Sequence, residues 1–353
     1  AGPCTLPLSV LEESQAEFVD YHSAGMSLIE MSHRGKHFVA VHEEAIDLVR
    51  TVYGVPDEFD VLFLQGGATL QFTMVPMNLL KSSEKGAYVN SGTWAKGAIA
   101  DAQHYGDVYT AWDGTDCNFT RMPNTGEIDI QSGTRYLHLT SNETIGGIRF
   151  ADWPKVDVPL IGDMSSDYMS RPVPWDRFDL VYGGAQKNLG PAGMALVIIR
   201  KKVARENNQN IGRYLRYDIQ ADKDSMFNTP PVFPIYMLGK VLKWMRDQGG
   251  VEAMERQAED KAGILYRAID ESGGYYRCPV DVDSRSVMNV VFRLPSEDLE
   301  KTFLSGADAA GLLNLKGHRS VGGIRASIYN AMPKEGVQAL VTFMSEFQGA
   351  HPA

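Results

Sequence analysis

Short apolar runs alternate along the chain with longer segments whose apolar residues recur at helical spacing. The strand-sized runs are residues 61–64, 136–139, 158–161, 180–182 and 194–199. Helix-compatible segments lie between them, such as the one in which Trp94, Ala98 and Ala102 share one face. This alternation is typical of α/β proteins, so it predicts a large domain with a mostly parallel central sheet flanked by helices.

A change of pattern near residue 249 indicates a second, smaller domain. A helical apolar stripe over residues 235–245 ends at the pair Gly249–Gly250. Beyond that pair the pattern predicts a helix over 253–269, a strand over 288–294, a helix after Ser296 and a last helix around 337–347. We therefore expect a large domain over residues 9–246 and a smaller α+β domain over 247–353, which the N-terminal segment 1–8 joins.

The acidic composition excludes several classes of partner. Of the 353 residues, 34 are Lys or Arg and 44 are Asp or Glu, for a formal net charge of −10. A general binder of nucleic acid or of an anionic membrane would carry a basic face, and no apolar run approaches the length of a membrane span. Cys4, Cys117 and Cys278 offer neither a disulfide framework nor a zinc spacing. We expect a metal-free cytoplasmic protein, or one in an organelle stroma or matrix if a targeting segment was removed upstream.

The first candidate for chemistry is Lys187, which lies between two apolar runs in the glycine-rich segment 183–193. Small neighbours leave room for a flat ligand, and burial favours the neutral amine, which can attack a carbonyl and form a Schiff base. A lysine in a turn, taken alone, is more often solvated. The segment is not a P-loop, because Pro191 follows Gly190, and the chain has no Gly-x-Gly-x-x-Gly motif after a strand.

Four further segments supply candidate ligand contacts. Asp163 follows an apolar run, where a carboxylate can meet a cationic ring nitrogen or, equally well, cap a helix. Residues 65–72 predict a strand, a glycine turn and a helix start, whose free amides and Thr69 hydroxyl form a phosphate cradle. Trp94 can stack on a ring, although a tryptophan is more often in a core or an interface. Asn142-Glu143-Thr144 has the form of a glycosylation sequon, which in an intracellular chain leaves a polar loop after a strand.

Two basic clusters complete the set of candidates. They contain His33 and Arg34 in the first, and His318, Arg319 and Arg325 in the second. Arginine forks bind carboxylates and phosphates through two parallel hydrogen bonds. Either cluster alone suits a solvated loop, but two His-Arg pairs flanked by glycines in an acidic protein favour binding of a small anion.

Taken together, these stretches resemble the phosphoserine aminotransferases, a family of class V, fold-type I enzymes that use pyridoxal 5′-phosphate. The matching stretches run over nearly the whole chain and are residues 1–3, 30–35, 65–68, 183–188, 227–231 and 316–333, the last being long and highly specific. The resemblance implies the fold-type I architecture, the pyridoxal phosphate cofactor, and an obligate homodimer with active sites shared across its interface.

On matching positions, the resemblance implies a role for each cofactor-site candidate. Lys187 would carry the cofactor as a covalent Schiff base and then shuttle a proton, while Asp163 would pair with the pyridinium nitrogen. Trp94 would stack on the ring, and Thr144 would contact its phenolic-oxygen side. The cofactor phosphate would be held by Ala68, Thr69 and Gln186, and by Asn228 and Thr229 of the partner subunit. Some family members have Gly-Arg in place of Ala68-Thr69, so here amides and a hydroxyl would replace that arginine.

The resemblance also implies the reaction: reversible transfer of the amino group between glutamate and 3-phosphohydroxypyruvate, giving 2-oxoglutarate and O-phospho-L-serine, in serine biosynthesis. Arg325 would grip the α-carboxylate that both amino acids share. Their distal phosphate or carboxylate would meet His33, Arg34, His318 and Arg319. The same pocket should admit 4-phosphohydroxy-L-threonine, an amino acid of pyridoxal phosphate biosynthesis.

Three alternatives compete with this interpretation. A cysteine desulfurase needs a mobile, exposed cysteine, whereas Cys278 precedes Pro279 and Cys117 is far from any motif. Serine–glyoxylate-type transaminases handle uncharged substrates and would not use two His-Arg pairs. A non-catalytic protein that kept the fold would be favoured by loss of Lys187 or Asp163, and both are present.

Overall fold

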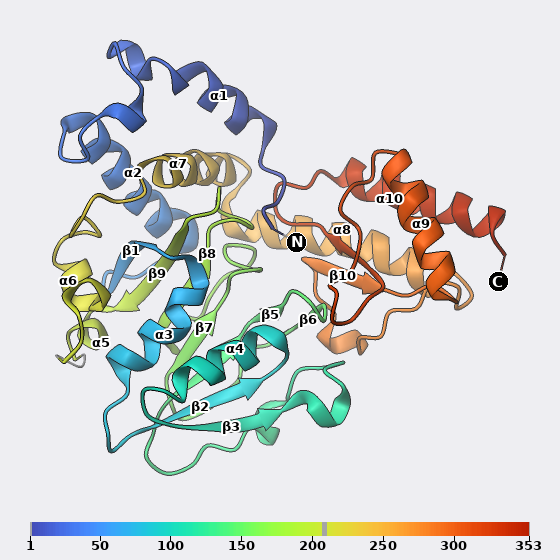
Figure 1. The fold of residues 1–353 in the computed structure, drawn as a ribbon, viewed down its shortest axis with the longest axis horizontal. Coiled ribbons are helices and arrows are strands. Elements are labelled where there is room, and N and C mark those ends of the chain that lie inside the picture. Colours follow the sequence, from blue (N-terminus) through green and yellow to red (C-terminus); the bar gives the residue numbers. More distant parts are fainter. Residues whose placement is uncertain (1, 207–209, 353) are drawn as a thin grey trace.

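The computed structural model describes residues 2–206 and 210–352; Ala1, the first residue of the 1–3 motif, lies outside them. In this part of the chain the large domain is built on a seven-stranded sheet with the order β1-β9-β8-β7-β4-β2-β3 (Figure 1). Its strands are β1 (Phe59–Gln65), β2 (Lys85–Asn90), β3 (Asp107–Asp113), β4 (Thr134–Thr140), β7 (Leu160–Asp163), β8 (Phe178–Gly184) and β9 (Met194–Arg200).

The direction of the strands brings several loops to one edge of the sheet. Strands β8, β7, β4, β2 and β3 are parallel to one another, whereas β9 runs antiparallel to both β8 and β1. Strands β8 and β9 are therefore joined by a short loop that stays at the carboxyl end of β8. This loop, residues 185–193, contains Lys187.

Helices cover both faces of the sheet, which explains why β8 is buried along its whole length. One face packs against α2 (Lys36–Tyr53) and α7 (Val232–Asp247), and the other against α3 (Gly67–Leu79) and α4 (Thr93–Ala102). The short helices α5 (Lys201–Arg205) and α6 (Tyr217–Ala221) follow β9. Helix α1 (Leu8–Phe18) projects from the body beside α7 (Figure 1). Its large apolar side chains Leu8, Leu11 and Phe18 are exposed.

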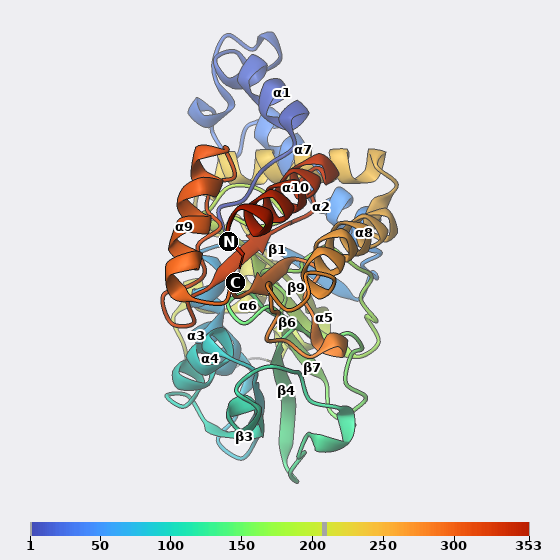
Figure 2. The ribbon, with the colours of Figure 1, turned by 90° about the vertical axis from the view of Figure 1, so that its right-hand side faces the viewer.

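The C-terminal part forms a smaller α+β unit with its own apolar core. It contains α8 (Gly250–Asp270), α9 (Glu297–Ala309), α10 (Lys334–Ala350) and the antiparallel pair β10 (Asn289–Phe292) and β11 (Ile324–Ser327). These elements lie together to one side of the sheet (Figures 1 and 2). The predicted boundary at Gly249–Gly250 falls at the start of α8, whose first turns pack on the core of the large domain and whose later turns pack on the small core.

The predicted fold class is confirmed, and the predicted strands and C-terminal helices are present with shifted ends. Ser296 accepts a hydrogen bond from the amide of Leu299 and so caps α9. The sequence analysis did not predict α2, β2 or β3. Within the described residues, no helix is both long and apolar enough to cross a bilayer, and no cluster of three or more His, Cys, Asp or Glu side chains suits a metal ion.

Candidate active site

Lys187 lies buried at the centre of the candidate site, with 7% of its surface exposed. Its Nζ donates a hydrogen bond to Thr144 Oγ1 at 2.8 Å. Burial lowers the pKa of this amine to about 8, against the opposing effect of the Asp163 and Glu143 carboxylates, and the Arg325 cation lowers it further. The amine therefore reaches its neutral form at a lower pH than a solvated lysine does, which is the direction that the burial argument predicted.

Asp163 ends β7 and is buried beside the lysine. Its Oδ1 accepts hydrogen bonds from the Ser165 amide at 2.9 Å and the Ser165 hydroxyl at 2.6 Å. No helix follows, so the alternative role as a helix N-cap is wrong and the carboxylate instead closes a turn. Burial raises its pKa, and among the described residues it forms no ion pair. A cationic ligand next to Asp163 would therefore be stabilised.

The glycine turn between β1 and α3 has the geometry of an anion cradle. Gly66 has a φ of +93°, and a Cβ there would lie 2.6 Å from Leu70 Cδ2, so only glycine fits. Helix α3 begins directly at Gly67, and its first amides have no partner within the helix. Ala68 and Thr69 lie in this first turn, where an anion is favoured.

Trp94 lies in the first turn of α4 and is 38% exposed, so it is not a core residue. The centre of its ring is 5.9 Å from Lys187 Nζ. An aromatic face is thus open toward the space beside the lysine, which is the placement that a stacking role requires.

A single cavity of about 360 Å³ joins these groups. Its lining includes seven of the predicted cofactor-site residues: Ala68, Thr69, Trp94, Thr144, Asp163, Gln186 and Lys187. Gly2 lines it as well, and the amide of Cys4, two residues further on, donates to the carbonyl of Gln186 at 3.1 Å. The N-terminal segment therefore lies against the lysine loop.

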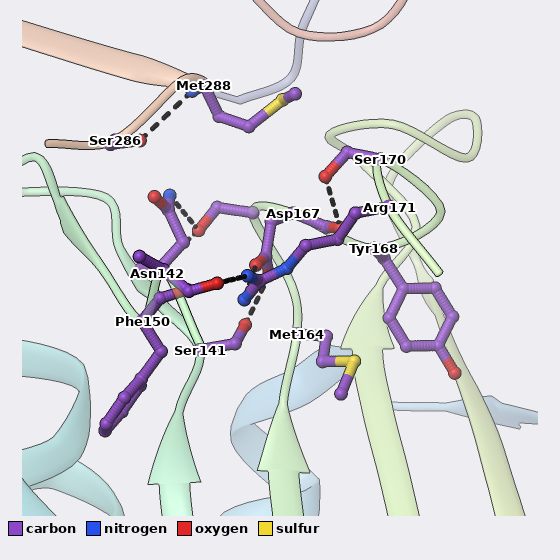
Figure 3. A network of polar contacts seen from close by, with 12 residues as sticks. Ser141, Asn142, Phe150, Met164, Asp167, Tyr168, Ser170, Arg171, Ser286 and Met288 are labelled. Atoms are coloured by element: carbon purple, nitrogen blue, oxygen red, sulfur yellow. Dashed lines mark hydrogen bonds and ion pairs between the residues drawn. The ribbon is translucent and has the colours of Figure 1, made fainter. Parts of the chain in front are cut away.

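A buried polar network supports the floor of the site (Figure 3). Asp167 forms an ion pair with Arg171 at 3.4 Å, and both side chains are almost completely buried. Ser141 contacts the Asp167 carboxylate, and its amide donates to the carbonyl of Asp163 at 2.9 Å. Asn142 Nδ2 donates to Asn289 Oδ1 of β10 at 2.8 Å, which links the site directly to the small unit.

Arg325 is half-buried on β11 and lines a second cavity of about 320 Å³ between the two parts of the chain. The wall opposite contains Phe119 and Ile145, the latter directly after Thr144. Burial lowers the pKa of its guanidinium, which nevertheless stays protonated. Arg325 does not line the lysine cavity, although its charge acts on Lys187. Its contact with a substrate carboxylate stays a prediction.

The other predicted substrate residues are not gathered at this place within one chain. His33 and Arg34 line a separate cavity formed with residues 222–227, while His318 and the exposed Arg319 lie on the loop before β11. Their joint role as one anion pocket stays a prediction.

Asn228 and Thr229 also lie outside the lysine cavity. Both are exposed, and the carbonyl of Thr229 accepts a hydrogen bond from Gln65 Nε2 at 2.9 Å. Their predicted contact with the cofactor phosphate of a partner subunit is compatible with this exposure and stays a prediction.

Glu143 is the residue that the sequence analysis missed. It is 1% exposed, and its carboxylate accepts the Ala95 amide at 2.9 Å and the Trp94 amide at 3.5 Å. Burial raises its pKa to about 7. The sequence placed this residue in a polar loop; its contacts with α4 come from folding and leave no local signal.

Comparisons with known proteins agree on one family. The family model for aminotransferase class-V matches residues 1–340. A phosphoserine aminotransferase of Laribacter hongkongensis is 53% identical over 351 residues, which cover 99% of this chain and 98% of the relative. The structure of phosphoserine aminotransferase from Bacillus circulans subsp. alkalophilus has a TM-score of 0.97 at 51% identity, covering 99% of this chain and 97% of the other. A pyridoxal phosphate-bound phosphoserine aminotransferase from Trichomonas vaginalis has a TM-score of 0.93 at 38% identity, covering 98% of each chain.

Proposed function

The chain belongs to the phosphoserine aminotransferase family of class V aminotransferases, and from this premise we propose that it transfers an amino group between glutamate and 3-phosphohydroxypyruvate with pyridoxal phosphate bound at Lys187. The products are 2-oxoglutarate and O-phospho-L-serine, so the reaction belongs to serine biosynthesis. The observation that carries the proposal is the buried Lys187 amine, which shares one cavity with the Asp163 carboxylate and the amino end of α3.

The residues of this cavity fit pyridoxal phosphate group by group. Asp163 is a buried carboxylate that forms no direct ion pair in the described part of the chain, which suits a protonated pyridine nitrogen. The first turn of α3 suits the phosphate, and the open face of Trp94 suits the ring. When bound, the cofactor supplies an electron sink for the bond that breaks at the substrate's Cα.

Lys187 performs two tasks in this mechanism. Its amine would hold the cofactor covalently, where the cofactor would supply the electron sink. Burial lowers the pKa of this amine to about 8, so its neutral form would take the proton from the substrate's Cα and, once protonated, would return it. The Thr144 hydroxyl, 2.8 Å from Nζ, orients it for this transfer.

Arg325 would bind the α-carboxylate common to glutamate and phosphoserine through its planar fork. The distal phosphate or carboxylate would be bound by His33, Arg34, His318 and Arg319. Because one chain holds these two pairs apart, the proposed pocket requires a second copy of the chain. The exposed apolar side chains Leu8, Leu11, Phe18, Val19 and Met26 support a homodimer, since a monomer rarely exposes so many together.

Cysteine desulfuration has less support. Cys4 is the cysteine that lies against the lysine loop, and burial raises the pKa of its thiol to about 11. The thiol is therefore protonated at neutral pH and a poor nucleophile. All three cysteines are free, in keeping with the cytoplasm, which we propose as the compartment. The same anion pocket would also accept 4-phosphohydroxy-L-threonine as a second substrate.

An absorbance titration of the purified, cofactor-loaded protein tests the proposal. O-phospho-L-serine should convert the yellow form to the amino form of the cofactor at low concentration, while L-serine and L-cysteine should require far more. A yellow protein that ignores phosphoserine would retain the cofactor but reject the substrate. A protein that stays colourless with added pyridoxal phosphate, or Lys187→Ala with retained turnover, would overturn the mechanism.

A further inference from the structure

Glu143 occupies a position between the two sides of the cofactor cavity. It forms β5 together with Asn142, and directly precedes Thr144, whose hydroxyl accepts the hydrogen bond from Lys187 Nζ. Its carboxylate reaches across to the start of α4, the helix that carries Trp94. None of the roles derived above uses this buried carboxylate.

The start of α4 depends on Glu143 because its own sequence provides no side-chain cap. The residue before the helix is Gly92, and no side chain of the local sequence accepts its first amides. Glu143 accepts the amides of Ala95 and Trp94 instead. The approach is close: a Cβ on Gly92 would lie 2.9 Å from Glu143 Cδ, so glycine is needed for the carboxylate to reach the amides.

This contact bears on the orientation of the indole. Trp94 is in the first helical turn, and 38% of its surface is exposed, so few neighbours hold its ring. The direction of its Cα–Cβ bond, and hence the space that the ring can reach, follows the backbone that Glu143 binds. A negative charge at this helix end is also stabilising, because the first amides carry a partial positive charge.

We propose that Glu143 is a positioning residue, which caps α4 from a neighbouring strand and thereby fixes the Trp94 indole against the cofactor ring. This inference rests on the proposed function only in that the ring is pyridoxal phosphate. The carboxylate also interacts with Lys187 and Asp163, and burial raises its pKa to about 7. Around neutral pH, protonation would turn one of the two accepting oxygens into a donor and weaken the cap.

The test is a double-mutant cycle of Glu143→Ala and Trp94→Ala, read as the dissociation constant of pyridoxal phosphate from the holoenzyme. Glu143→Ala should raise this constant about tenfold in the Trp94 protein, but less than about twofold in the Trp94→Ala background, where no ring is left to position, because residues that act through each other are not additive. Additive effects would overturn the proposal. If Glu143→Ala does not fold, Glu143→Gln takes its place in the same cycle, with a smaller expected effect, since one amide oxygen still accepts.

Visible circular dichroism of the bound cofactor gives a second readout. This signal reports the surroundings of the cofactor ring, so a general loss of protein stability would not change it. The wild-type band should change with a midpoint near pH 7, and this step should be absent in Glu143→Gln. Ser296→Ala is the matched control, because it removes the cap of α9 and lowers stability without touching the cavity. A pH step that persists in Glu143→Gln, or an equal change in Ser296→Ala, would refute the role. Binding of pyridoxal phosphate without turnover of phosphoserine would reject the proposed substrate and leave this test intact.

Discussion

Replacing Lys187 by methionine should make the cofactor-free protein more stable while abolishing transamination. The two side chains have similar volume, so the substitution removes the buried charge without opening a large cavity. Burial lowers the pKa of Lys187 from 10.5 to about 8. At about 1.36 kcal/mol per pKa unit, the charged amine costs the folded state about 3 kcal/mol. Loss of the hydrogen bond to Thr144 offsets about 1 kcal/mol of the gain, which leaves about 2 kcal/mol at pH 7.

The sign of the pH dependence follows from the lowered pKa. Below pH 8 both the folded and the unfolded protein carry the charge, so the full cost applies. Between pH 8 and 10.5 the folded state has released the proton while the unfolded state retains it, so the wild-type protein gains stability as the pH rises. The advantage of Lys187→Met should therefore shrink across this window.

Chemical denaturation of both cofactor-free proteins between pH 7 and 10.5 measures this difference. A variant that is no more stable than the wild type at pH 7 would refute the argument, and so would an advantage that does not change with pH. Retained transamination by Lys187→Met would contradict the role of the amine as the proton carrier.

Three further changes test other parts of the site. Gly66→Ala should destabilise the protein by about 1–2 kcal/mol and raise the dissociation constant of pyridoxal phosphate, because the turn needs a φ of +93° and Leu70 blocks a Cβ. Thermal melts and cofactor titrations measure the two effects. Gly212→Ala is the control and should show neither change, because a Cβ there meets nothing within 4 Å. Arg325→Lys should raise KM for glutamate and for 3-phosphohydroxypyruvate by about tenfold each, because an ammonium cannot form the two parallel hydrogen bonds that a guanidinium forms with a carboxylate. An effect on one substrate alone would contradict a shared carboxylate site. Asp167→Ala should lower the free energy of unfolding in urea by about 3–5 kcal/mol, because it leaves the buried Arg171 guanidinium without its carboxylate partner. Asp298→Ala removes an exposed ion pair and should change this free energy by less than about 1 kcal/mol. Similar losses in the two variants would disprove the claim that burial makes the difference.

The sequence predicted the parts of this fold whose signals are local. Buried strands such as β8 and β9 are continuous apolar runs, and the amphipathic helices of the small unit repeat every three to four residues. Strands β2 and β3 were missed because they lack such runs. Strand β2 begins with Lys85 and Gly86, and β3 at the sheet edge has its apolar residues interrupted by Thr110.

The residues of the candidate site likewise fall into those with a local sequence signal and those without one. Lys187 and Asp163 were predicted because each lies beside an apolar strand in a motif of small residues. Glu143 was missed because its partner Ala95 is 48 residues away, and no local pattern reports a cap supplied by a distant strand. For the basic clusters, the residue types indicate an anion, but their sequence positions carry no information on which copy of the chain each one serves.

The pairing of β1 with β9 has a consequence for the order of folding. Gln65, next to the phosphate cradle, lies opposite Met194, which follows the lysine loop. One ladder thus joins two halves of the pocket that are synthesised far apart in time. A nascent chain that ends before the lysine loop possesses the cradle but no lysine, and contacts of such long sequence separation form slowly. Capture of pyridoxal phosphate at Lys187 would therefore report that the sheet is complete, at a stage of synthesis when residues 201–353 are still to be added.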